Sequence, residues 1–385
     1  MTRGLSLYLD AVRFSAAFLV LLSHWAYPRF TGGSYLWIRE LNLGSDAVVV
    51  FFVLSGLVIA FAAERKDKTG GVFVFNRLTR LYSVALPALL LTFAADRLGV
   101  LLWPEAYDGW WYNAISAQQF LFTGLTFTGE WGLSGLRLGT NGPYWSLSYE
   151  VAYYCLFAAA VYLRGGVRLV VLCLIALLCG YKPLLLLPAW LAGVWTWKVI
   201  SRPDFRAGPA LSWAMIAGPV AVYGLCLAGD VPGLLMQLTE QGSGLTNAQI
   251  GMLLRFSDEF FWNNMLAVLV AVNFAGVAAL TRSGALSRVP ADLRKAVVWA
   301  AGGSFSLYLV HYPLLQFAGS AMGRFRDVPG YDFILLAVVF ALSMAFAALF
   351  ERRLGVFRKT VLSVARTGND QRRRVLALVR LASGR

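Results

Sequence analysis

Ten separate runs of apolar residues, most of them long enough to cross a lipid bilayer, constrain this chain more than any other feature. A helix needs roughly 20 apolar residues to cross the hydrocarbon core. Transmembrane β-strands would instead alternate over about ten residues. With 58% hydrophobic and 14% charged residues, the sequence predicts an all-α, polytopic membrane protein with about ten transmembrane helices. The runs occupy residues 5–27, 46–63, 81–102, 145–163, 167–180, 183–200, 210–229, 264–281, 297–318 and 331–351.

The fifth run is short and weakly apolar. Only Gly180, Tyr181 and Lys182 separate it from the sixth. The region 167–200 is therefore expected to form either two short helices or one kinked hairpin.

The distribution of basic residues predicts how the chain is oriented. With the N-terminus in the cytoplasm, most of the 34 lysines and arginines fall in segments on the cytoplasmic side, which the positive-inside rule favours. Both termini are then cytoplasmic, and the two long segments 103–144 and 230–263 lie outside. Asp10 and Arg13 interrupt the first apolar run, so it is interpreted as a retained span rather than a cleaved signal peptide.

The C-terminal segment is strongly basic. Residues 352–385 are predicted to form a cytoplasmic tail, in which Arg372, Arg373 and Arg374 precede an apolar stretch typical of a helix on an anionic membrane surface. The segment lacks aromatic residues after Phe357, so nucleic acid is not an expected partner. Residues 1–351 are assigned to a single membrane domain.

The first span contains ionisable residues, each of which costs about 2.5 to 3.5 kcal/mol in the middle of a bilayer. Arg13 and His24 are separated by about three helical turns, or about 16 Å, and share one face. Arg13 could pair with Asp10 or extend toward the headgroups, and His24 could simply lie at the interface. However, the second of the two histidines, His311, also lies in a span. Because histidine is well suited to proton transfer, the two together indicate chemistry.

Polar residues in other spans suggest further parts of a site. Arg77 and Arg80 are three residues apart, which suits either a phosphate group or lipid headgroups. Glu150 enters the membrane, where a carboxylate either finds a partner or has a raised pKa, and His24 lies at a compatible depth if the first and fourth spans adjoin.

The ninth apolar run also carries polar residues. Ser304, Tyr308 and His311 share one helical face, which either lines a cavity or serves packing. In the second run, Ser55 and Gly56 are typical of close helix contact.

Five motifs occur in an order that resembles the family-3 membrane acyltransferases, from about residue 5 to residue 350. They are Arg13 and His24 with ten residues between them, FFVLSG at 51–56, RLTRLY at 77–82, GPYWSLSYE at 142–150 and SFSLYLVHYPL at 304–314. The resemblance implies a ten-span protein of the bacterial cytoplasmic membrane. Such a protein takes an acyl group, usually acetyl, from cytoplasmic acyl-coenzyme A and transfers it to a hydroxyl of an extracytoplasmic carbohydrate or glycolipid.

The resemblance also implies roles for individual residues. His24 and Arg13 match the essential histidine and arginine of the family, and Glu150 matches the acid of its tryptophan-serine-leucine segment. Arg77 and Arg80 match the arginine motif expected near the coenzyme A phosphates. The implied partners are acyl-coenzyme A (acetyl-coenzyme A), the acceptor and membrane lipid, and no metal is expected.

Two positions depart from the family pattern without touching a charged group. Ser83 stands where many members have proline, and Leu57 replaces a common phenylalanine. Some members carry a fused extracytoplasmic esterase-like domain, and this sequence is not expected to include one.

Two functions are compatible with these residues. In an acyltransferase, His24 is the general base or is transiently acylated, and Glu150 orients or charges it. Arg13 stabilises negative charge in the thioester channel or holds the arm of the donor. In a secondary transporter or exporter, buried charges line a substrate path instead. The acyltransferase is favoured because the two halves show no repeat. The outer segment 103–144, with Tyr107, Trp110, Trp111 and Tyr112, also resembles a lip for an acceptor.

Overall fold

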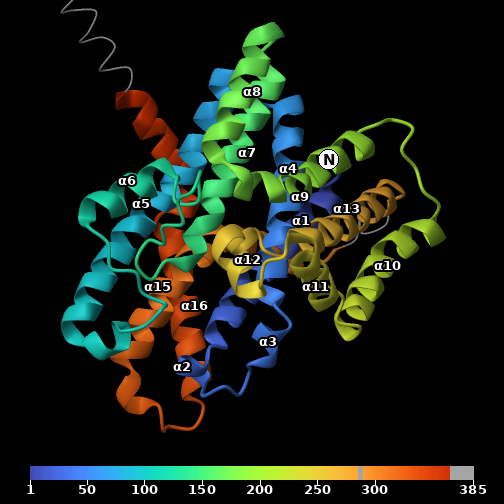
Figure 1. Ribbon diagram of the computed structural model, residues 1–385. Coiled ribbons are helices and arrows are strands. Elements are labelled where there is room, and N and C mark those ends of the chain that lie inside the picture. Colours follow the sequence, from blue (N-terminus) through green and yellow to red (C-terminus); the bar gives the residue numbers. More distant parts are fainter. Residues whose placement is uncertain (285–288, 365–385) are drawn as a thin grey trace, which may run out of the picture.

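The computed structural model describes residues 1–284 and 289–364, and within them the chain is helical and contains no β-strand (Figure 1). A single β-bridge joins Leu138 and Asn141. Each of the ten apolar runs is helical, so the predicted all-α membrane fold is confirmed. The corresponding helices are α1 (Arg3–Trp25), α4 (Leu43–Arg65), α5 (Gly70–Leu102), α7 (Trp145–Tyr162), α8 (Gly165–Cys179), α9 (Tyr181–Ile200), α10 (Pro209–Ala228), α13 (Phe260–Arg282), α15 (Ser304–Ala321) and α16 (Tyr331–Leu349).

Seven helices within the described ranges are long and apolar enough to cross a membrane: α1, α4, α5, α9, α10 and the stretches that contain α13 and α16. The other three are shorter or more polar. Helix α8 has 15 residues, while α7 and α15 have 18 residues each and carry Glu150 and His311. That these three helices also cross the membrane, which would give about ten spans in total, stays a prediction.

Two helix boundaries resolve or correct the expectations. Gly180, at φ 76°, separates α8 from α9, so the region 167–200 forms two helices, a short one of 15 residues and one of 20 residues. The ninth run was expected to be one helix over 297–318, and this is wrong. It is divided between α14 (Ala291–Ala301) and α15, with Gly302 and Gly303 between them. A side chain at position 303 would come within 2.9 Å of Met344, so glycine permits α16 to approach there.

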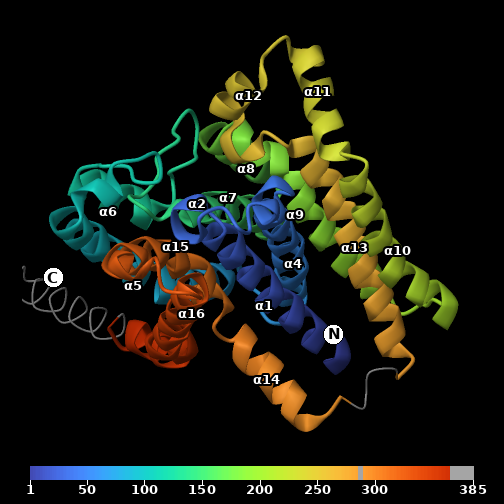
Figure 2. The same cartoon turned by 90° about the horizontal axis from the view of Figure 1, so that it is seen from below.

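The long helices α1, α4 and α9 occupy the middle of the molecule, with α10 and α13 side by side on one flank and α5, α15 and α16 on the other (Figure 2). Helices α4 and α9 make backbone contact through two glycines. A Cβ at Gly56 would lie 2.0 Å from the Trp190 carbonyl oxygen, and one at Gly193 would lie 1.8 Å from the Val53 carbonyl oxygen. The packing role expected for the Ser-Gly pair is confirmed for Gly56.

Short helices fill the connections between the long ones. They are α2 (Pro28–Thr31), α3 (Trp37–Glu40), η1 (Pro104–Tyr107), α6 (Ala117–Thr126), η2 (Gly142–Tyr144), α11 (Val231–Ser243), α12 (Asn247–Leu254), η3 (Arg255–Ser257), η4 (Gly323–Phe325) and η5 (Glu351–Arg353).

The buried carboxylate of Glu130 joins the predicted outer segments 103–144 and 230–263 to the first turn of α9. Glu130 lies 3.4 Å from Lys182 Nζ and 3.6 Å from Arg255 Nη2, and the side chains of Glu130 and Lys182 are only 1% and 2% exposed. Burial raises the pKa of Glu130, while the two cations oppose that shift. This group fixes the loop around residue 130 against the helical core.

Candidate active site

A cavity of about 340 Å³ lies between α1, α4, α5, α7 and α15, a volume within the range of small-molecule sites. We call it the arginine cavity because four guanidinium groups reach it from three parts of the chain. Its charged and polar lining residues are Arg13, Ser55, Arg77, Arg80, Ser146, Glu150, Tyr154, Ser304, Tyr308 and Arg358. The structure therefore brings together four of the five residues that the sequence singled out, all except His24.

Three of the cavity arginines are each paired with one carboxylate of the protein. The pair of Arg13 with Asp10, one helical turn away, was one of the alternatives considered for the first span, and it is confirmed. The distances are 3.2 Å for Arg13 to Asp10, 3.2 Å for Arg77 to Asp67 and 3.4 Å for Arg80 to Glu351.

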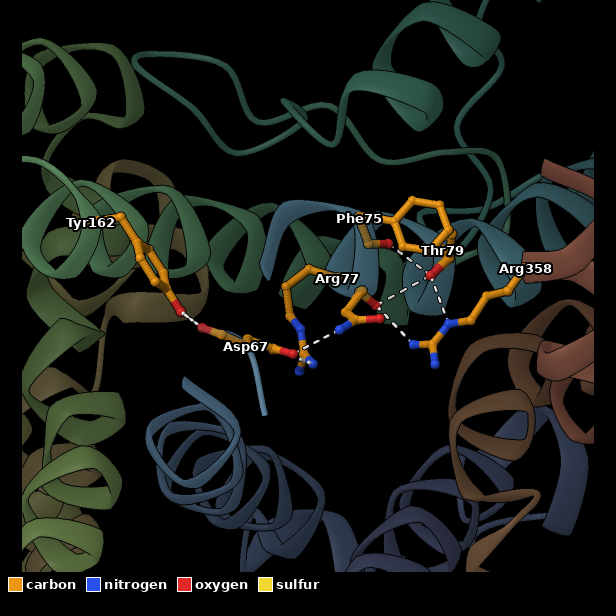
Figure 3. A network of polar contacts seen from close by, with 7 residues as sticks. Asp67, Phe75, Arg77, Thr79, Tyr162 and Arg358 are labelled. Carbon is orange, nitrogen blue, oxygen red and sulfur yellow. Dashed lines mark hydrogen bonds and ion pairs between the residues drawn. The ribbon is translucent and has the colours of Figure 1, made fainter. Parts of the chain in front are cut away.

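Arg77 and Arg80 lie one turn apart on α5, as their spacing predicted. Asp67, just before α5, holds Arg77 in place. It also accepts a hydrogen bond from Asn76 at 2.7 Å and, through its backbone carbonyl, one from the Tyr162 hydroxyl (Figure 3). The side chain of Asp67 is 2% exposed, so Arg77 is held by a buried carboxylate rather than free in solvent.

The fourth arginine, Arg358, comes from the helical segment that follows α16. Its Nε donates to Thr79 Oγ1 at 3.0 Å and its Nη2 donates to the Asn76 carbonyl at 3.3 Å (Figure 3). Sequence reasoning placed Arg358 in the tail 352–385 and missed this contact. The basic residues Arg372–Arg374 of that tail lie outside the described residues.

Glu150 lines the arginine cavity rather than contacting His24. Its carboxylate accepts hydrogen bonds from Ser55 Oγ at 2.8 Å and from the Tyr154 hydroxyl. Trp190 also donates to Ser55, at 3.2 Å, so this corner is held by three helices. The expected contact between Glu150 and His24 is therefore wrong. The face of α7 that carries Glu150 and Tyr154 turns toward α4, whereas His24 turns toward α15.

His24 instead contacts the second histidine. Its Nδ1 lies 3.1 Å from Nε2 of His311, which is fully buried. Each Nδ1 also lies 2.9 Å from a backbone carbonyl in the preceding turn of its helix, that of Val20 for His24 and that of Leu307 for His311. A carbonyl can only accept, so the network assigns a proton to both Nδ1 atoms. Nε2 of His24 then carries a free lone pair.

Tyr308 lies between the arginine cavity and the two histidines, which we call the histidine pair. Its side chain lines the cavity, its hydroxyl donates to Ser146 Oγ at 2.7 Å, and its ring centroid lies 6.4 Å from that of His311. The expected face of Ser304, Tyr308 and His311 is therefore split. The first two line the cavity and the third supports His24.

Aromatic rings surround His24 on the side away from the cavity. The ring of Tyr312 lies 4.6 Å from that of His24 and the ring of Tyr27 lies 6.0 Å away. Trp110, from the segment expected to form an acceptor lip, lies 5.4 Å from Tyr27 and is 61% exposed. Within residues 1–284 and 289–364, no group of three or more His, Cys, Asp or Glu side chains is arranged to hold a metal ion.

The fold and this site define a multi-pass membrane protein with a charged internal cavity beside a histidine pair. Residues 6–350 match the acyltransferase domain that defines acyltransferase family 3, so the chain belongs to that family.

Two curated relatives are similar over part of their length. An O-acetyl transferase of Shigella phage Sf6 is 28% identical over 43% of this chain and 49% of the relative. The acyltransferase MdmB of Streptomyces mycarofaciens is 30% identical over 39% of this chain and 37% of the relative. The chain thus matches about half or less of the length of either relative. No solved structure matches it.

Proposed function

We propose that the protein is a membrane O-acyltransferase that takes an acyl group, acetyl in the first instance, from cytoplasmic acyl-coenzyme A. The acceptor is a hydroxyl of a carbohydrate or glycolipid on the outer side of the bacterial cytoplasmic membrane. The observation that carries the proposal is the arginine cavity ending at Tyr308 beside the histidine pair. Family membership and the relatives named O-acetyl transferase and acyltransferase support the reaction type.

The donor is assigned to the arginine cavity. Guanidinium groups bind phosphate oxygens with paired hydrogen bonds, and Arg77, Arg80 and Arg358 gather at the end of the cavity that the basic-residue distribution assigns to the cytoplasm. Coenzyme A phosphates would bind there, with the thioester extending toward Tyr308. Arg13 also lines the cavity, about 16 Å along α1 from His24, and would hold the arm of the bound donor.

The acceptor is assigned to the far side of His24. Nε2 of His24 removes the proton of the acceptor hydroxyl as the new oxygen–carbon bond forms at the thioester carbonyl. The carbon–sulfur bond breaks, and the same nitrogen returns the proton to the coenzyme A sulfur. His311 is the positioning residue, since its Nε2 shares the one proton on His24 Nδ1 with the Val20 carbonyl, and both acceptors keep the lone pair of His24 on Nε2.

Glu150 is assigned to the donor rather than to His24. It holds Ser55 and Tyr154 in the wall of the cavity. It lines the same cavity as the four arginines. The proposed contribution of Glu150 is therefore to shape the donor site.

Reconstitution in liposomes tests the reaction. Purified protein should consume labelled acetyl-coenzyme A only when an envelope glycan fraction from cells lacking the protein is present, and the label should appear as alkali-labile ester on the glycan. A His24→Ala protein serves as the control. Movement of glycan across the bilayer without loss of thioester would contradict the proposal and support the transporter.

A further inference from the structure

Three arginines cluster on the side of His24 where the acceptor is assigned. The Cζ atoms of Arg29 and Arg39 lie 4.5 Å and 3.6 Å from the ring centroid of Tyr27. Arg137 comes from a different loop and lies 5.7 Å from the ring of Trp110, which in turn contacts Tyr27. We call Arg29, Arg39 and Arg137 the outer arginine cluster.

None of the three has a carboxylate within ion-pair distance in the part of the chain that the structure describes. Their hydrogen bonds go to neutral groups. Arg39 donates to the Ser23 carbonyl at 3.0 Å, Arg137 to the Trp110 carbonyl at 2.7 Å, and Arg29 to the Tyr312 hydroxyl at 2.7 Å. Among the described residues, Arg29 and Arg39 therefore have no carboxylate partner beside the histidine pair, whereas Arg137 acts at longer range on Glu130 and opposes the rise of its pKa.

Two other basic residues on the same predicted side have a carboxylate partner, whereas Arg324 and Arg326 form no ion pair among the described residues. Lys182 and Arg255 share the buried carboxylate of Glu130. The positive-inside rule also disfavours arginine in outer segments. The outer arginine cluster differs from the exposed Arg324 and Arg326 because its guanidinium groups are partly buried against aromatic rings, where a ligand that supplies negative charge would be most favourable.

Aromatic rings and guanidinium groups together match one class of acceptor. The exposed ring of Trp110 offers a flat apolar surface on which a sugar ring can stack, and guanidinium groups bind carboxylate or phosphate in pairs. Tyr27 follows α1, and burial raises the pKa of its hydroxyl to about 12, against the effect of the nearby arginines. The hydroxyl is therefore a neutral donor at physiological pH.

We propose that the outer arginine cluster binds a negatively charged group, a carboxylate or a phosphate, of the acyl acceptor. This inference rests on the proposed function, because only under that function is the bound molecule an acyl acceptor. The acceptor is then an acidic carbohydrate, with a uronic acid or a sugar phosphate close to the hydroxyl that receives the acyl group.

Binding without any acyl donor tests the cluster separately from the reaction. The probes are methyl glucuronide, glucose 1-phosphate and the neutral methyl glucoside, titrated into detergent-solubilised full-length protein by calorimetry. At least one anionic probe should bind about tenfold or more tightly than the neutral one. Raising the salt concentration should weaken that binding, since partly exposed charges are screened over about 10 Å at 0.1 M. The two anionic arms distinguish carboxylate from phosphate.

Variants locate the binding. Arg39→Gln and Arg137→Gln remove guanidinium groups whose hydrogen bonds go only to backbone carbonyls, so the protein should keep its thermal unfolding midpoint. Each should weaken the anionic probe about tenfold and leave the neutral probe unchanged. Arg326→Gln, an exposed arginine on another outer segment, is the matched control and should bind as the unmodified protein does.

Equal affinity for charged and neutral probes, or full affinity in both cluster variants, would overturn the inference. So would the absence of saturable binding of either anionic probe. Binding of phosphatidylglycerol without binding of either anionic probe would assign the cluster to a lipid headgroup and also overturn it. Failure of the proposed function looks different, because labelled thioester would then not be consumed with any acceptor.

Discussion

The arginine cavity and the outer arginine cluster use the same side chain in two different ways. In the cavity, Arg13, Arg77 and Arg80 each have a carboxylate of the protein beside them. In the outer cluster, the guanidinium groups lie on aromatic rings with no carboxylate at ion-pair distance among the described residues. The cavity therefore has many fixed charges and a small net charge, whereas the cluster has few charges and all of one sign.

This difference indicates what each region is suited to do. A paired arginine is held in one orientation, which favours accurate placement of a ligand more than tight binding. An unpaired arginine keeps a positive charge that only a negatively charged ligand can neutralise, so it discriminates between charged and neutral molecules. Substitutions in the two regions should consequently change different measured quantities.

The largest effect is expected at the histidine pair, which lies between the two regions. His24→Ala should lower kcat by about 10²- to 10⁴-fold because the general base is lost, with little change in the KM for acyl-coenzyme A. Steady-state rates in detergent or liposomes provide the measurement. His311→Gln should lose less, since His311 acts only through His24. A His24→Ala protein that retains most of its rate would contradict the assignment of His24 as the general base.

The next largest effect concerns stability at Glu130. Glu130→Gln leaves Lys182 buried without a counter-charge, which should cost about 3 to 5 kcal/mol of the free energy of unfolding and lower the thermal unfolding midpoint in detergent. Glu130→Gln combined with Lys182→Met should recover part of that loss. Glu105→Gln, at an exposed carboxylate, is the control. An unchanged midpoint in Glu130→Gln would show that a basic residue on this side needs no counter-charge, and would weaken the argument for the outer cluster.

A smaller effect is expected for Arg77 in the cavity. Arg77→Gln should raise the KM for acetyl-coenzyme A roughly 10- to 100-fold, the usual worth of a hydrogen bond to a charged group, and leave kcat nearly unchanged. The effect should be smaller with a thioester that lacks one phosphate. A fall in kcat with an unchanged KM would contradict the assignment of Arg77 to donor binding and blur the distinction between the two regions.

The smallest effect is expected for Arg358, which touches only neutral oxygen atoms of α5. Arg358→Gln should raise the same KM several-fold, as expected for one ordinary hydrogen bond of about 0.5 to 1.5 kcal/mol. Lys359→Gln, at the exposed neighbouring residue, should leave the KM unchanged. Equal effects of the two substitutions would indicate that the segment after α16 acts through its overall charge and not through Arg358.

The helices were predictable because crossing a bilayer demands a long apolar run, and each of the ten runs is helical. Even the break at Gly180 was one of two stated alternatives. The division of the ninth run was missed, because two glycines inside an apolar stretch do not by themselves reveal that α16 approaches there.

The site was only partly predictable because its contacts join helices that are distant in the sequence. The spacing of Arg77 and Arg80 on one helix was enough to place them together. The contact of His24 with His311 and the position of Arg358 depend on how α15 and the segment after α16 pack, which no local pattern encodes. Glu150 was assigned to the wrong neighbour for the same reason. The presence of only two histidines in the whole chain was the one signal that could have paired them.

The close contact of α4 with α9 has a consequence for how the protein is assembled. Several helices are made between these two, so α4 must already be in the bilayer, without its main partner, while α5, α7 and α8 are still being synthesised. Helix insertion and helix association are separate stages in a membrane. A methyl group at Gly56 would leave the first stage intact and block the second, so that a chain with correct topology would still be recognised by the cell as unfinished.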